Sequence, residues 1–151
     1  MDNLIECQRA FIEIDINKKL RPKLLDLRPG TRVVSNSFDM GDWIPDYEII
    51  TEENPYGWNI AYLWIVPVKA SGEWKIGNDI LTLKQSFQEV HGWLTSQDMT
   101  FPVSEGKLNG STITFRIDKY LYTGQVNGKK MTGTRTSEGN LSDWEAEKMQ
   151  Q

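Results

Sequence analysis

The chain has 151 residues, with 38% hydrophobic and 11% aromatic residues, including six tryptophans. This length and aromatic content allow one domain with a sizeable core. The net charge of −4 and the pI of about 5.1 give no electrostatic basis for nucleic-acid binding, which needs clustered Lys and Arg.

The first third of the chain predicts a helix followed by a strand. Residues 4–16 fit both a helix and an extended piece, and a helical segment follows from Pro22. Arg28-Pro29-Gly30 ends it, because proline cannot continue a helix and glycine turns easily. Val33–Phe38 is rich in strand-forming residues, so this part resembles one helix–strand unit of a doubly wound sheet. A loop, Asp39–Asp46, then breaks regular structure.

From Tyr47 onward the hydrophobic period is two, which indicates strands. Residues 47–51 form a short strand, and residues 60–66 are apolar on both faces, which predicts a strand buried on both sides. Strands over 80–87 and 90–94 follow, and the stretch 99–103 is looser because of Pro102.

The last third contains the clearest turn signals. Asn109-Gly110 and Asn127-Gly128 predict two-residue hairpins. Gly92, Gly124 and Gly133 lie within strands and predict bulges or bends where a sheet closes. Turns at about ten-residue spacing predict an antiparallel meander.

We therefore predict an α+β fold that is mainly β, with a barrel or strongly curved sheet. Residues 1–46 form a short N-terminal helix–strand segment, packed on or swapped with the barrel-like part at 47–151. Together they are expected to form one compact unit.

Other features favour a soluble, cytoplasmic protein without a membrane partner. The single cysteine, Cys7, cannot form an internal disulfide, as is usual in a reducing compartment. The first residues do not resemble a secretory signal, and no apolar run is long enough to span a bilayer.

The segment LRPKLLDLRPGTRVVSNSFDMGDWIPD (residues 20–46) resembles the fifth-strand region of a group of bacterial class I S-adenosylmethionine-dependent methyltransferases. In that group an L-x-PG-x-R-V-V strand precedes an F-D-M-G-D-W loop. The resemblance continues more loosely through Tyr62–Pro67, Gly72–Trp74 and Leu81–Gln85, in the β-rich part that follows the catalytic core of the family.

The family's cofactor site lies upstream of the matched segment, on a glycine-rich loop. This chain contains no G-x-G-x-x-G, and a sheet needs that first crossover to hold a nucleotide-like cofactor. The resemblance therefore implies the C-terminal portion of such an enzyme, without the cofactor-binding half and with no cofactor of its own. Asp39, Asp42 and Trp43 would form a rim loop, and the N-terminal segment could join two copies as a homodimer.

No catalytic or metal-binding residue is predicted. The spacing of Asp39, Asp42 and Asp46 does not match a calcium loop. His91 is the only histidine, so no set of zinc ligands of the usual kind is available.

The aromatic residues suggest a small-molecule pocket instead. Apolar walls with few polar groups are typical of such pockets, and the predicted lining is Trp64, Trp74, Gln85, Trp93 and Tyr122. Alternatively, these side chains simply fill a small barrel.

Three hypotheses about function follow. The leading one is a non-enzymatic binding or interaction module related to the C-terminal region of a methyltransferase, with a small apolar or aromatic ligand. The second is one part of a split or truncated methyltransferase, and the third is a purely structural interaction protein with a filled barrel.

Overall fold

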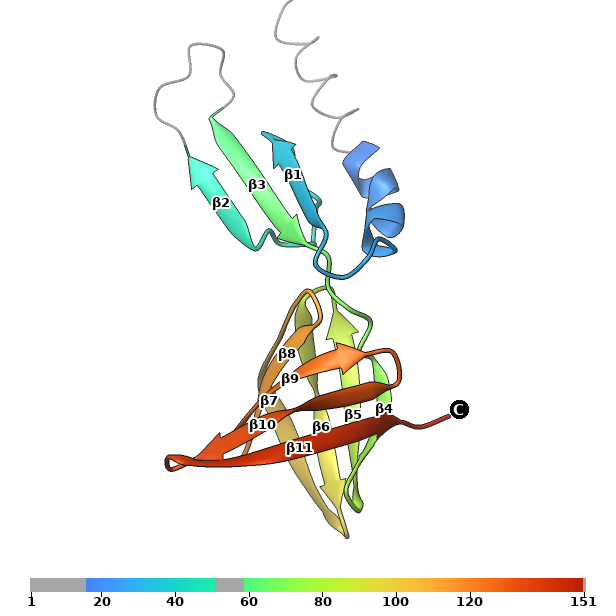
Figure 1. Cartoon of the computed structure of the whole chain (residues 1–151). Coiled ribbons are helices and arrows are strands. Elements are labelled where there is room, and N and C mark those ends of the chain that lie inside the picture. The colour runs from blue at the N-terminus through green and yellow to red at the C-terminus, as the bar shows by residue number, and fades with distance from the viewer. Residues whose placement is uncertain (1–15, 51–58, 151) are drawn as a thin grey trace, which may run out of the picture. The chain divides into compact units, whose positions relative to one another are not determined.

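A computed structural model describes residues 16–50 and 59–150 of the chain. The chain divides into two compact units, Met1–Val66 and Pro67–Gln151. The first contains a helix and a three-stranded sheet, and the second is a closed eight-stranded barrel (Figure 1). The predicted antiparallel barrel and the short N-terminal helix before it are confirmed.

The first unit is built around a central strand. A helix, described over residues 16–25, ends before the turn at Pro29-Gly30, where Gly30 has a positive φ of 87°. The strands are β1 (Arg32–Asn36), β2 (Tyr47–Ile50) and β3 (Ile60–Ile65), in the sheet order β1-β3-β2. Both outer strands are antiparallel to β3.

This arrangement differs from the sequence-based expectation in two ways. The predicted boundary at 46/47 differs from the division after Val66, because β2 and β3 pair with β1. The prediction that residues 60–66 form a strand buried on both faces is wrong for β3, in which Trp64 alone is fully buried. Its neighbours Val34 and Ile49 on the flanking strands are 70% and 63% exposed, so one sheet face is largely uncovered.

The second unit is a meander in which each strand pairs with the next. Its strands are β4 (Gly72–Ile76), β5 (Asp79–Ser86), β6 (Glu89–Ser96), β7 (Met99–Asn109), β8 (Thr112–Ile117), β9 (Tyr120–Asn127), β10 (Lys130–Ser137) and β11 (Asn140–Lys148). The ring closes where β11 pairs with β4.

Both predicted asparagine–glycine hairpins are present, shifted by one residue. Asn109 pairs with Thr112, and Asn127 pairs with Lys130, so the glycine is the first of the two loop residues. Gly110 and Gly128 have φ values of 57° and 60°, as a turn with glycine at its first position requires.

The barrel interior is filled by apolar residues that alternate along the strands. Trp74, Leu81, Phe115 and Met131 are fully buried within this cluster. The predicted bulge at Gly92 is confirmed by a register shift between Val90 and Gly92. The barrel has two ends, one beside the chain segment that leads into β4 and the other beside the β4–β5 turn.

Candidate functional site

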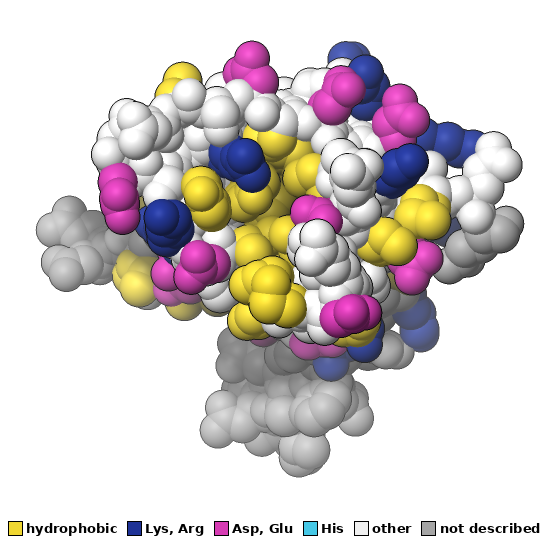
Figure 2. Space-filling view, turned by 90° about the horizontal axis from the view of Figure 1, so that it is seen from below, with side chains coloured by type: hydrophobic (Ala, Val, Ile, Leu, Met, Phe, Trp, Pro, Cys, Tyr) yellow, Lys and Arg dark blue, Asp and Glu magenta, His cyan; other side chains and the backbone are white. Residues whose placement is uncertain are grey.

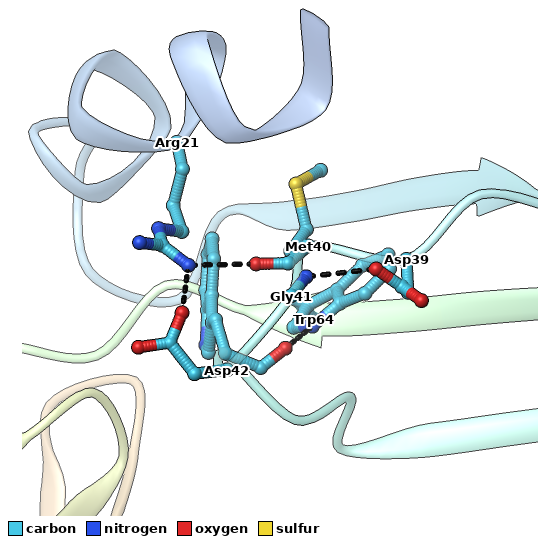
Figure 3. Close-up of polar contacts among 7 residues, drawn as sticks. Arg21, Asp39, Met40, Gly41, Asp42 and Trp64 are labelled. Carbon is cyan, nitrogen blue, oxygen red and sulfur yellow. Dashed lines mark hydrogen bonds and ion pairs between the residues drawn. The ribbon is translucent and has the colours of Figure 1, made fainter. Parts of the chain in front are cut away.

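The loop between β1 and β2 is held to the helix by polar contacts (Figure 3). Arg21 Nη1 donates to Met40 O at 2.8 Å and to the Asp42 carboxylate. This hydrogen bond from Arg21 lowers the pKa of the Asp42 carboxyl. Asp39 accepts a hydrogen bond from Gly41 N at 2.8 Å, as turn-forming aspartates often do.

The same loop also anchors the central strand. Trp43 is fully buried, and its carbonyl accepts a hydrogen bond from Trp64 Nε1 at 2.7 Å. Asp46 Oδ2 accepts from Ile65 N at 2.7 Å. These contacts of Asp39, Asp42, Trp43 and Asp46 stabilise the loop and attach it to the helix and to β3. Across the described residues, no group of three or more His, Cys, Asp or Glu is arranged to hold a metal ion.

The five predicted pocket residues occupy different environments. Trp64 belongs to β3 of the first unit, whereas the other four belong to the barrel unit. Trp74 is fully buried in the barrel core, and its Nε1 donates to Ala70 O at 2.9 Å. Trp93 is 36% exposed, and the Lys84 ammonium lies 5.2 Å from its ring centroid.

Gln85 on β5 forms hydrogen bonds with the segment that precedes β4. Its Nε2 donates to Val68 O at 3.0 Å and to Phe87 O at 2.7 Å, and its Oε1 accepts from Ala70 N at 2.8 Å. The amide of Gln85 therefore uses both donors and its acceptor on backbone groups, which leaves little capacity for a ligand.

The end of the barrel away from Gln85, beside the β4–β5 turn, is open to solvent. β11 pairs with β4 only at Glu147 and Lys148. The two strands are therefore not paired along the rest of their length, beside the β4–β5 turn. A hollow of about 690 Å³ lies here, within the usual range of small-molecule sites. Figure 2 looks at this end and shows hydrophobic side chains at the floor of the hollow with charged groups of both signs around it.

Aromatic rings form part of the wall and floor. Tyr122 stacks on Phe115 with centroids 4.9 Å apart, and Trp144 meets both rings edge-on at 5.6 and 5.7 Å. The Trp144 ring fits against the strands because Gly124 has no side chain. A Cβ at this position would lie only 2.7 Å from the ring. Tyr122 is the predicted pocket residue that lines this hollow.

Arg135 is a lining residue that sequence reasoning missed. On β10 it follows Met131 and Gly133 at a spacing of two, and Tyr122 and Ser142 are its partners on β9 and β11. Its Nε donates to Ser142 Oγ at 3.0 Å, and its Nη1 lies 3.4 Å from Tyr122 Oη. The hydrogen bond to Tyr122 raises the pKa of Arg135. An arginine side chain is in any case charged at physiological pH.

The guanidinium of Arg135 also lies over an aromatic ring. Its central carbon is 5.1 Å from the Tyr120 ring centroid, which is the geometry of a cation–π contact. None of the ion pairs among the described residues involves Arg135. Its alternation with Met131 was the signal that could have identified it, because this pattern places its side chain on the inner face.

Comparisons with known proteins support a methyltransferase-like relationship for part of the chain. The chain is 39% identical over 57 residues to a protein-lysine N-methyltransferase of Saccharolobus islandicus (strain REY15A). The match covers 37% of this chain and 35% of that protein, so the chain spans about a third of the length of this relative. No protein-family model matches, and no solved structure matches significantly.

No helix among the described residues is long and apolar enough to cross a membrane.

Proposed function

We propose that the chain is a non-enzymatic interaction module that corresponds to the C-terminal part of a class I S-adenosylmethionine-dependent methyltransferase. In this proposal its three-stranded sheet extends a methyltransferase-type sheet that other residues provide, either in the same polypeptide or in a second chain. The observation that carries the proposal is the outer edge of β1, which pairs with no described residue.

β1 pairs with β3 on one side, and no described residue pairs with its other side. Exposed edge strands are often protected by a proline or a bulge. The β1 sequence RVVSN has neither. In our proposal β1 corresponds to the fifth strand of that family's sheet, so a strand of the cofactor-binding half pairs with this edge.

The exposed apolar face of this sheet supports the same conclusion. The register places Val34, Leu63 and Tyr47 in one row across the three strands. Val34 and Tyr47 are 70% and 59% exposed, and Ile49 on the same face is 63% exposed. Contiguous apolar surface of this kind marks an interaction site. In a doubly wound fold, helices cover each sheet face.

The similarity to the Saccharolobus islandicus enzyme identifies a usable partner. The experiment co-expresses this chain with that enzyme from which the 57 similar residues have been removed. We expect a one-to-one complex in size-exclusion chromatography and S-adenosylmethionine binding by the complex in calorimetry.

Two variants make this experiment specific. Val34→Asp places a charge on the exposed apolar face and should abolish the complex. Asn140→Asp adds the same charge at an exposed position of β11 in the barrel unit and should preserve it. Failure to form a complex, or a complex that Val34→Asp does not affect, would contradict the proposal. Self-association of this chain through β1 would favour the homodimer instead.

A further inference from the structure

The open end of the barrel has a charge arrangement that indicates a ligand. Arg135 is a cation on the inner face of β10, and it lines the hollow together with apolar and polar side chains. Arg135 is partly buried, and none of the ion pairs among the described residues supplies it with a carboxylate partner. Its partners in the structure are the neutral hydroxyls of Tyr122 and Ser142 and the face of Tyr120.

We propose that this hollow binds a monocarboxylate with an apolar body, whose carboxylate pairs with Arg135. A guanidinium presents several N–H donors in a planar fork that matches a carboxylate. Within the barrel, Arg135 donates one hydrogen bond from Nε and one from Nη1. A guanidinium has five N–H donors, so further donors remain for a ligand.

The hollow suits the apolar part of such a molecule. Leu94, Ile76, Tyr122 and Trp144 contribute apolar surface to it. Tyr122 and Trp144 are only 3% and 7% exposed, so packing against neighbouring side chains holds their rings in place. A wall that is ordered before binding reduces the entropy lost when a flat molecule binds.

The acidic residues at the rim limit the charge of the ligand. Asp79, Asp143 and Glu145 also line the hollow. They repel each negative charge of a ligand, so a dianion is repelled more strongly than a monoanion. A carboxylate is therefore preferred over a phosphate monoester, which carries close to two charges at neutral pH.

The test uses the whole 151-residue chain and three naphthalene compounds of the same ring system. These are 2-naphthoate, the neutral 2-naphthalenemethanol and the dianionic 2-naphthyl phosphate. Binding is followed by ¹H–¹⁵N NMR at the Nε–H signals of Arg135 and Trp144, which report directly on the hollow. We expect 2-naphthoate to bind at least about tenfold more tightly than the alcohol, and the phosphate to bind more weakly than the carboxylate.

Two matched variants remove one arginine charge each. Arg135→Gln should reduce the affinity for 2-naphthoate to about that for the alcohol. Arg116→Gln removes an exposed arginine that pairs with Glu105 on the barrel surface, and it should leave the affinity unchanged. The comparison of the three compounds on the unaltered chain needs no variant, so it remains decisive if Arg135→Gln does not fold.

Three results would overturn the proposal. The first is equal affinity for the carboxylate and the alcohol. The second is a set of shifts confined to the exposed face around Val34 and Tyr47. The third is the absence of saturable 2-naphthoate binding at concentrations up to about 1 mM.

Discussion

Replacing Gln85 by methionine should strongly destabilise the barrel unit. Methionine has a similar length but removes the amide, so it abolishes the bonds from Gln85 to Val68 O, Ala70 N and Phe87 O. A hydrogen bond contributes about 1 kcal/mol to stability, and an unsatisfied buried group costs about 1–3 kcal/mol. Because the site is only partly buried, water can replace some of the lost bonds. We therefore expect a loss of about 2–4 kcal/mol.

Urea unfolding measures this loss, and each kcal/mol corresponds to about 4–8 °C in Tm for a domain of this size. Exchange of the Ala70 amide hydrogen provides a local readout, because this amide donates to Gln85. The control is Gln125→Met, which removes one exposed hydrogen bond to Thr112 and should change stability by less than about 0.5 kcal/mol. A loss below about 1 kcal/mol for Gln85→Met would refute this role of the three bonds.

Two further predictions concern other parts of the molecule. In Arg21→Gln the pKa of Asp42 should rise toward its ordinary value of 3.8, because the hydrogen bond that lowers it is lost; NMR titration of the Asp42 carboxyl measures this. Since folding lowers this pKa, the interaction stabilises the folded protein above the unfolded pKa, and this stabilisation is lost as the pH falls through the folded pKa. The variant lacks this interaction, so its stability should fall less in acid. Gly133→Ala should destabilise the barrel by more than about 3 kcal/mol, because a Cβ there would lie 2.0 Å from Thr123 O. The outward Thr132→Ala on the same strand should have little effect, and a stable Gly133→Ala barrel in thermal denaturation would contradict this close approach of the two strands.

The barrel could be predicted because each of its hairpins is specified by residues that are close together in the sequence. Each hairpin is specified by a turn and by alternation on either side, as at Gly110 and Gly128. The division of the chain at Val66 could not be predicted in this way. β2 and β3 show the same period of two as the barrel strands, and their pairing with β1 depends on contacts between distant residues.

The candidate site was harder to predict because it depends on which face each side chain occupies. Trp74 and Trp93 are the same residue type, yet one is in the core and the other is 36% exposed. Grouping aromatic residues by type therefore combined residues from different faces and different units. Arg135 was missed because a charged residue is normally expected outside, although its spacing from Met131 indicated the inner face.

We propose that these residues contribute a sheet extension and a barrel but no cofactor site. Calorimetric titration of S-adenosylmethionine into the 151-residue chain tests this claim most directly. We expect no saturable binding at cofactor concentrations up to about 1 mM, because the chain contains no glycine-rich loop of the kind that holds the cofactor. Saturable binding with a micromolar Kd would contradict the claim, since it would require a cofactor site within this chain.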